Sequence, residues 1–255
     1  MRMLFLGDIV GNCGRDAVLR FVPAIRRELA LDYVVVNAEN ISGGRGTLPA
    51  AADELFGVGV DIISGGNHTF QHRELYPYLD ATPAILRPIN YPKGAPGHGI
   101  ATCGDLTVIN IIGRTFMGSD YDDPFRAADA AIAAIPAGQF VLVDFHAEAT
   151  SEKQAIGWYL DGRVTAVVGT HTHVPTADAR LLPRGTAFCT DAGMCGARDS
   201  IIGDEVDAVL QRFLTQMPTR LPAAKGTAMV NGLLIEADET TRKAVSIERL
   251  DRIMD

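Results

Sequence analysis

Seven polar side chains with metal-binding chemistry follow short apolar segments of this sequence. The segments cover residues 3–6, 33–37, 61–64, 140–145 and 164–169, and the side chains that follow them are Asp8, Glu39, Asn40, Asn67, His146, His171 and His173. A mixture of imidazole, carboxylate and amide-oxygen ligands suits Mn, Fe or Zn better than Ca²⁺ or a thiolate-bound cluster. Four of the six histidines of the chain follow these segments, namely the three in this set and His68. The pattern therefore predicts a transition-metal site.

The spacing within this set adds one expectation about geometry. His171 and His173 are two residues apart, so in an extended segment their side chains would share a face and approach neighbouring metals. Taken singly, a histidine or an aspartate at such a place is more often a structural residue or part of a turn, and only the ordered set indicates a function. His72 and His98 lack this placement, and we interpret them as surface or hydrogen-bonded polar residues.

The elements that must position these side chains alternate between strand and helix. Helical spacing occurs at residues 15–30, 49–55, 71–79, 124–135 and 152–160, between the apolar segments. The alternation predicts an α/β fold, in which strand ends gather at one edge of a sheet. Two hairpins, 98–103 with 106–113 and 227–237 with 243–250, indicate antiparallel strands of a mixed second sheet stacked on the first. No linker divides the chain, and we expect a single domain over residues 1–255.

Composition limits the class of protein. The 255 residues are 47% hydrophobic and carry a net charge of −8, which disfavours extended nucleic-acid binding because that would need a basic face. The amino-terminal apolar run is too short for a signal peptide, and no segment approaches the ~18 apolar residues of a membrane span. The four cysteines show no paired spacing, which indicates reduced thiols. We expect a cytoplasmic protein that does not bind membranes.

The motifs resemble those of the calcineurin-like metallophosphoesterases, whose blocks read DxH, GDxxD, GNH[DE], H and GHxH in this order. Gly66-Asn67-His68 matches the third block, and Thr170-His171-Thr172-His173 matches the last with threonine in place of glycine. Val10 stands where the first block has histidine, Glu39-Asn40 replaces the aspartate of the second, and Thr69 replaces the acid after the third. These departures are typical of one subfamily, the YmdB-type phosphodiesterases associated with 2′,3′-cyclic nucleotides, and the similarity extends over essentially the full length.

The resemblance implies a four-layer α/β/β/α sandwich of two mixed sheets and two metal ions per chain, with Fe or Mn preferred and Zn as an alternative. It further implies a ligand set and a proton donor: Asp8, Glu39, Asn40 and His173 on one ion, Glu39 bridging to a second ion held by Asn67, His146 and His171, and His68 as the donor. Two dications, two carboxylates and a metal-bound hydroxide leave a small positive charge, which suits attack on a monoanionic phosphodiester. No cluster of Arg or Lys flanks the motifs, so we expect phosphodiesters, especially 2′,3′-cyclic nucleotides, to be preferred over phosphomonoesters.

Other interpretations stay open at this point. The same set of metal ligands could serve a regulatory metal- and nucleotide-binding protein with low residual turnover, or a dinuclear amidase or peptidase. The chain could also form a homo-oligomer. The sequence contains neither a GxGxxG turn nor a GxSxG elbow. We interpret Cys13 as a small packing residue, and Arg114, Lys153 and Arg198 as solvated or salt-bridged surface bases rather than phosphate ligands.

Overall fold

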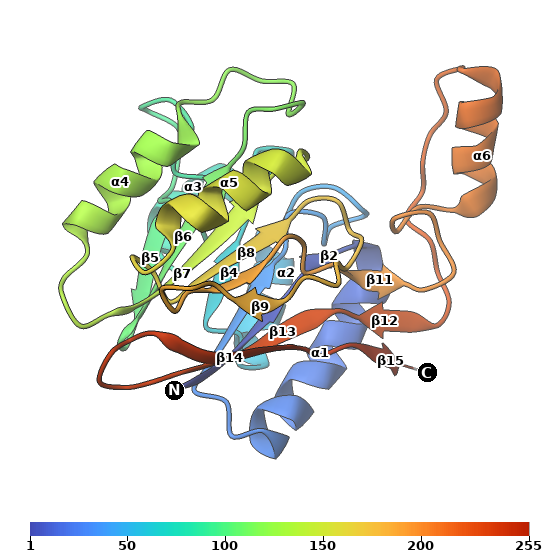
Figure 1. Ribbon diagram of the computed structural model, residues 1–255. Coiled ribbons are helices and arrows are strands. Elements are labelled where there is room, and N and C mark those ends of the chain that lie inside the picture. Colours follow the sequence, from blue (N-terminus) through green and yellow to red (C-terminus); the bar gives the residue numbers. More distant parts are fainter. Residues whose placement is uncertain (255) are drawn as a thin grey trace.

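The computed structural model describes residues 1–254, in which two β-sheets lie between two sets of helices (Figure 1). The first sheet has the order β14-β13-β1-β3-β4 and the second the order β5-β6-β7-β8-β10-β9, and both contain parallel and antiparallel pairs. The strands of the first sheet are β1 (Arg2–Leu6), β3 (Tyr33–Asn37), β4 (Ile62–Ser64), β13 (Gly232–Ala237) and β14 (Ala244–Arg249). Those of the second are β5 (Ile100–Cys103), β6 (Leu106–Ile112), β7 (Phe140–His146), β8 (Ala166–Thr170), β9 (Arg180–Leu181) and β10 (Ala187–Cys189).

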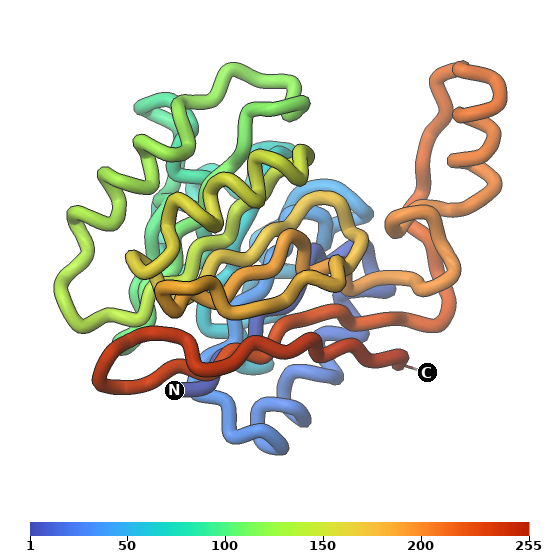
Figure 2. Tube along the Cα trace, viewed as in Figure 1, coloured from blue at the N-terminus to red at the C-terminus, as the bar shows by residue number. Residues whose placement is uncertain are grey.

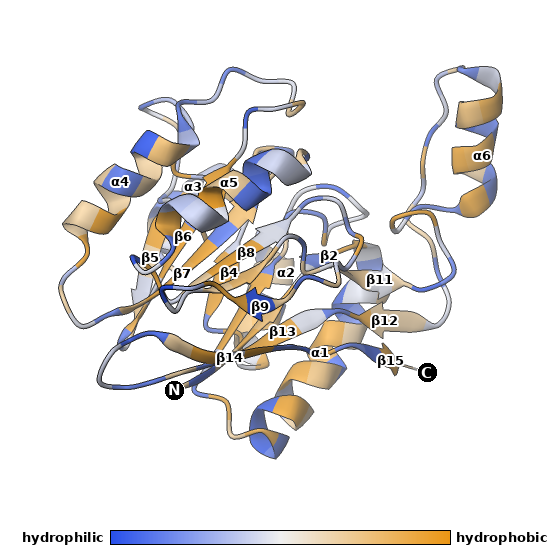
Figure 3. Cartoon of the chain, viewed as in Figure 1, coloured by the Kyte–Doolittle hydropathy of each residue, from blue (hydrophilic) through white to orange (hydrophobic). Residues whose placement is uncertain are grey.

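Three apolar layers hold these elements together. Helices α1 (Gly11–Glu28), α2 (Pro49–Gly57) and α3 (Leu75–Ala81) share a buried cluster with one face of the first sheet. The opposite face of that sheet packs on the second sheet, for example through Phe5 and Leu142. Helices α4 (Pro124–Ala134) and α5 (Thr150–Leu160) cover the outer face of the second sheet. Because the central strands are buried on both faces, they are largely apolar along their length (Figure 3). The predicted α/β/β/α sandwich is confirmed.

A third, smaller sheet of order β15-β12-β11-β2 continues the first sheet. Strands β1 and β13 are neighbours in the first sheet, but their continuations β2 and β12 are separated by β11, and we call this separation the split. Gly7 alone separates β1 from β2 (Asp8–Ile9), and Asn231 alone separates β12 (Ala228–Val230) from β13, while β15 (Arg252–Met254) follows β14. Strand β11 (Met194–Ala197) enters the split: the Gly7 N–H donates to Asn231 O, but the next N–H, that of Asp8, donates to Gly193 O. A Cβ atom at Gly7 would lie 2.0 Å from Gly193 O, so the insertion requires glycine there. The split decides where the Asp8 side chain lies.

Two parts of the fold differ from the sequence-based expectations. The carboxy-terminal hairpin of β13 and β14 pairs with β1 in the first sheet, whereas we expected it in the second. Residues 198–227, which we call the α6 arm, leave the sandwich after β11, form helix α6 (Val206–Thr215) and return at β12 (Figures 1 and 2). The sequence analysis did not predict this helix. In the part of the chain that the structure describes, no helix has the length and apolar character needed to span a membrane.

Candidate metal centre

The ends of β3, β4, β7 and β8 bring one group of predicted ligands together. His146 lies at its centre: its Nε2 atom is 2.8 Å from Asn67 Oδ1, 3.1 Å from His171 Nδ1 and 3.4 Å from Glu39 Oε2. Atoms that bind one cation at about 2.0–2.2 Å lie about 2.8–3.6 Å from each other in tetrahedral or octahedral geometry. Three of these residues, Glu39, His146 and His171, can place one ligand atom each within 4.8 Å of the others. The group therefore has the spacing of ligands around a single ion.

A second group adjoins the first through Glu39. Asn40 Nδ2 lies 2.9 Å from Glu39 Oε1 and 3.2 Å from His173 Nε2, which is 3.7 Å from Asp8 Oδ1. Asp8 reaches this place because β2 pairs with β11 beyond the split in the first sheet. A cavity of ≈ 340 Å³ opens on both groups and is lined by Glu39, Asn40, His171 and His173 among others. The structure thus brings all seven predicted ligands to one edge of the sandwich.

The hydrogen bonds of the three histidines determine which ring nitrogen faces the cluster. His173 Nδ1 lies 2.7 Å from the backbone oxygen of Ile202, and His171 Nε2 lies 3.1 Å from Glu148 Oε2. Because both partners only accept, these nitrogens carry the ring hydrogens. His146 Nδ1 lies 3.0 Å from Thr170 Oγ1, whose own hydrogen goes to Asp144, so Nδ1 is again the donor. Each ring therefore turns an unprotonated nitrogen toward the cluster.

The inward nitrogens of His146 and His171 face other electron-pair donors, and this observation fits a bound cation. His146 Nε2 faces His171 Nδ1 at 3.1 Å and Asn67 Oδ1 at 2.8 Å, with no hydrogen between them. Among residues 1–254, the Oδ1 atom of Asp8 is the buried side-chain polar atom that has no hydrogen-bond partner. Gly66 leaves the space open, since a Cβ atom there would lie 2.3 Å from Glu39 Oε2 and 2.4 Å from His146 Nε2. A cation between these atoms would relieve the repulsion and satisfy Asp8.

The charge of the surrounding core also favours cations. Asp8, Glu39, Asp144 and Asp191 are all buried close together, and Lys153 is the buried base among them. Burial, and then the neighbouring Glu39 carboxylate, raise the pKa of Asp8 well above its usual value. Burial lowers the pKa of His146 well below its usual value, which keeps the ring neutral and able to bind metal. Carboxylates buried in such number need cationic partners, and neutral histidines do not supply them.

The backbone at the last motif differs from the extended segment that we expected. Strand β8 ends at Thr170, and both His171 and His173 have positive φ angles, 102° and 64°. Such angles are uncommon outside glycine, although histidine adopts them more often than most residues, and they persist where surrounding contacts impose them. Asp191 supplies such contacts by accepting hydrogen bonds from the N–H and the hydroxyl of Thr172. The two histidines converge because of this tight turn, so the argument from strand alternation was wrong.

His68 lies beside the cluster and lines the same cavity. Its Nδ1 atom is 2.9 Å from Asn40 Oδ1 and 3.2 Å from Glu39 Oε1, two acceptors, so Nδ1 carries the hydrogen. Its Nε2 atom is 3.2 Å from Asn67 Nδ2, which donates to it. The side chain is 30% exposed, in contrast to the fully buried His146. His68 is therefore the histidine of the cluster with the greatest access to a molecule in the cavity.

Several basic residues differ from their sequence-based interpretation. Lys153 is 1% exposed rather than on the surface, and its ammonium group donates to Thr170 O and to Asp191. Arg114 and Arg198 pair with Asp123 and Asp199, as expected of salt-bridged surface bases. The expectation that no arginine cluster flanks the motifs is wrong. Arg45 lines the metal cavity, and it also lines an adjoining cavity with Arg212 and Arg220, which the α6 arm brings there.

The sequence analysis missed the residues that orient the ligands. Thr170, Glu148 and the Ile202 carbonyl each accept a ring hydrogen from one histidine. Thr170 carried a signal, because threonine stands where the resembling motif has glycine. Asp144 lies in the apolar segment 140–145, and it accepts hydrogen bonds from Thr170, Ser64 and Asn37. The Ile202 carbonyl gave no signal, because any residue in that position offers the same backbone oxygen.

Comparisons with known proteins agree over the whole chain. Residues 4–250 match the model of the YmdB-like protein family. The chain is 46% identical over 255 residues to the 2′,3′-cyclic-nucleotide 2′-phosphodiesterase of Bacillus subtilis, covering 98% of this chain and 96% of that protein. A crystal structure of a hypothetical protein from Thermus thermophilus superposes with a TM-score of 0.93 at 42% identity, with 100% of both chains covered. That of a novel phosphatase from Mycoplasma pneumoniae gives a TM-score of 0.93 at 31% identity, with 100% of this chain and 94% of that chain covered.

Proposed function

Because the chain belongs to the YmdB-like protein family, we propose that it is a phosphodiesterase that uses two metal ions to hydrolyse 2′,3′-cyclic nucleotides. The observation that carries the proposal is the set of three histidines that turn unprotonated nitrogens toward one another and toward oxygens of Asp8, Glu39 and Asn67, beside one cavity. The substrate class, 2′,3′-cyclic nucleotides, is taken from the name of the Bacillus subtilis relative. Mn or Fe suits the nitrogen and oxygen ligands, and Zn also fits them.

We assign the ligands in two sets that share Glu39. Asn67, His146 and His171 form one set with Glu39 Oε2, and Asp8, Asn40 and His173 form the other with Glu39 Oε1. Rotation of the Asn40 amide by about 180° exchanges its oxygen and nitrogen and turns Oδ1 toward Glu39 and His173. A carboxylate has two oxygens, so Glu39 is the residue that can serve both ions. When bound, the two ions lower the pKa of a water molecule and neutralise the charge that develops on the phosphate.

We assign His68 the proton that the leaving ribose oxygen needs. Hydrolysis of a cyclic phosphodiester forms one P–O bond from water and breaks one P–O bond to the ribose, whose oxygen then takes up a proton. A proton on His68 Nε2 would make an imidazolium, and its Nδ1–H would remain bonded to Glu39, which does not depend on the orientation of the Asn40 amide. The negative charge of Glu39, whose Oε1 atom lies 3.2 Å from His68 Nδ1, stabilises that cation. In the related GNH[DE] motif the acid after the histidine supplies this charge, and in this chain that position is Thr69.

The test compares substrates on metal-loaded protein. The kcat/KM values for 2′,3′-cyclic AMP, 3′,5′-cyclic AMP, a nucleoside monophosphate and a peptide are measured with Mn²⁺ or Fe²⁺ supplied. We expect 2′,3′-cyclic AMP to be the best substrate by at least about tenfold, because one positioned acid is enough for its strained leaving group. A preference for the monophosphate or the peptide would overturn the proposal, and binding of cyclic AMP without turnover would favour a regulatory role instead.

A further inference from the structure

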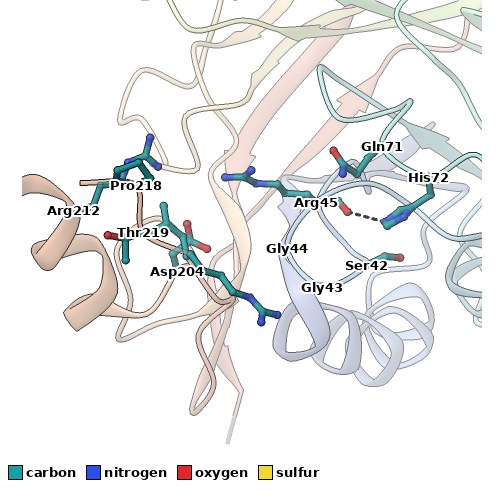
Figure 4. A pocket seen from close by; sticks show the side chains of 12 residues that line it. Ser42, Gly43, Gly44, Arg45, Gln71, His72, Asp204, Arg212, Pro218 and Thr219 are labelled. Atoms are coloured by element: carbon teal, nitrogen blue, oxygen red, sulfur yellow. Dashed lines mark hydrogen bonds between the residues drawn. The ribbon is translucent and has the colours of Figure 1, made fainter. Parts of the chain in front are cut away.

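A second cavity, of ≈ 500 Å³, lies beside the metal cavity, between the loop 42–46 and the α6 arm (Figure 4). The two cavities adjoin each other, because Gly44, Arg45, Asp204 and Leu221 line both. None of the seven proposed metal ligands lines the second cavity, and neither does His68. A molecule bound at the metals can therefore extend from the first cavity into the second.

Three arginines line this second cavity, namely Arg45, Arg212 and Arg220, and their charges are largely uncompensated. Within residues 1–254 their guanidinium groups form no ion pair and no hydrogen bond. Other arginines of this acidic chain are paired at 2.6–3.0 Å with a carboxylate, as in Arg2, Arg26, Arg114, Arg163, Arg242 and Arg249. Asp204 is the one residue with a carboxylate among those that line the cavity. Positive charge therefore exceeds negative charge here, although the whole chain carries −8.

The loop that carries Arg45 is fixed relative to the metal ligands. It follows Glu39-Asn40 directly and is closed by hydrogen bonds from Gly46 N to Glu39 O and from Ser42 N to Gly46 O. His72 Nε2 lies 3.0 Å from Arg45 O, which ties the loop to the neighbouring segment (Figure 4). Gly46 permits this approach, because it has a φ of +77° and a Cβ atom there would lie 2.6 Å from Gln71 Cβ. From this loop the Arg45 side chain extends toward Asp204 and Thr219 of the arm (Figure 4).

We propose that this cavity is a second anion-binding subsite, which holds a phosphate group on the 5′ side of the nucleoside whose 2′,3′-cyclic phosphate is hydrolysed. The proposal rests on the proposed function. Arginine is suited to this task, because its planar guanidinium presents paired donors to phosphate oxygens and stays charged at any physiological pH. The preferred substrate would then be a 2′,3′-cyclic nucleotide that also carries a 5′-phosphate. That phosphate belongs either to a mononucleotide or to the last linkage of a short oligoribonucleotide.

The experiment compares three substrates on the metal-loaded enzyme. They are 2′,3′-cyclic AMP, its 5′-phosphorylated form, and a 3′–5′ linked dinucleotide of two adenosines that ends in a 2′,3′-cyclic phosphate. The variant Arg212→Gln/Arg220→Gln removes two charges from the subsite and leaves the metal cavity lining intact. Its matched control is Arg126→Gln/Arg252→Gln, which changes the net charge equally at positions outside both cavities.

We expect the wild type and the control to prefer a substrate with the additional phosphate, with a higher kcat/KM and a lower KM. In the Arg212→Gln/Arg220→Gln variant this preference should fall by about tenfold or more. If kcat/KM rises only for the 5′-phosphorylated mononucleotide, the subsite holds a terminal 5′-phosphate. If kcat/KM rises for the dinucleotide as well, the subsite also holds the phosphate of an internucleotide linkage. An equal kcat/KM for all three substrates in the wild type, or a preference that survives in the variant, would overturn the subsite.

A binding measurement separates this proposal from the proposed function. Calorimetric titration of metal-loaded protein with adenosine 5′-monophosphate should show weaker binding by the Arg212→Gln/Arg220→Gln variant than by the control, again by about tenfold. Equal affinities would contradict the subsite. If 2′,3′-cyclic AMP is not hydrolysed by the wild type, the proposed function fails, and the calorimetric comparison still decides whether the arginines bind phosphate.

Discussion

Replacing Thr170 by valine should weaken the binding of the metal that we assign to His146 and His171. The Thr170 hydroxyl accepts the Nδ1 hydrogen of His146 and donates its own hydrogen to Asp144 Oδ1 at 2.7 Å. Valine has nearly the same shape, so the change removes these bonds with little loss of packing. His146 could then carry its hydrogen on Nε2, the nitrogen that faces the cluster, and such a ring cannot bind metal.

Two magnitudes follow from this structure. Loss of a hydrogen bond that orients a ligating histidine lowers metal affinity by about 10–100-fold. The change also leaves the buried Asp144 with one donor fewer, and its pKa is already raised to about 6 by burial, against the hydrogen bonds of Ser64, Thr170 and Asn37. The metal-free protein should therefore lose about 1–3 kcal/mol in the free energy of unfolding.

Thr165→Val is the matched control. Thr165 is also a buried threonine at a strand of the second sheet, and its hydroxyl accepts a hydrogen bond from Val141 N and donates one to Arg242 O, outside the metal cluster. Both variants should show a similar loss of stability in chemical unfolding of metal-free protein. Only Thr170→Val should bind Mn²⁺ or Zn²⁺ more weakly in competition with a chelator. If both variants bind two ions with wild-type affinity, Thr170 merely stabilises the core and the tautomer argument is refuted.

Three further predictions concern the cluster. Glu39→Ala should lower the occupancy of both metals in elemental analysis, while His173→Ala should mainly affect one; two tightly held metals in Glu39→Ala would contradict the bridging assignment. His68→Ala should keep both metals and lose about 10²–10⁴-fold in kcat on 2′,3′-cyclic AMP, as expected for a proton donor; loss of metal would make His68 a ligand instead. Burial keeps the pKa of His146 well below 6.5 in the folded protein, whereas the unfolded chain takes up this proton as the pH falls below about 6.5. As the pH falls below this value, the free energy of unfolding of the metal-free protein should therefore fall more steeply than that of His146→Gln. Urea unfolding at a series of pH values measures both, and a parallel pH dependence in the two proteins would contradict the pKa shift.

The identities of the cluster residues and the general architecture could be predicted from the sequence. Alternation of short apolar segments with helical spacing predicted the α/β fold, because buried parallel strands are apolar along their whole length. The same reasoning placed Asp8, Glu39, Asn67 and His146 at strand ends, which meet at one edge when the strands run parallel. The exception among the helices is α6, although apolar residues at 206, 209, 210 and 213 have helical spacing. Most of its apolar side chains stay exposed, Phe213 at 71%.

Only the tertiary structure decided how these residues act together. Insertion of β11 into the first sheet places Asp8, and the pairing of strands so distant in sequence has no local signal. The inward nitrogen of each histidine is chosen by a partner from another element: the side chain of Glu148, the hydroxyl of Thr170, or the carbonyl of Ile202 on the α6 arm. The α6 arm also sets two arginines beside the cavity more than 160 residues after Arg45 in the chain. Residue type is a local property of the sequence, whereas protonation, orientation and charge balance depend on contacts that form only when the chain folds.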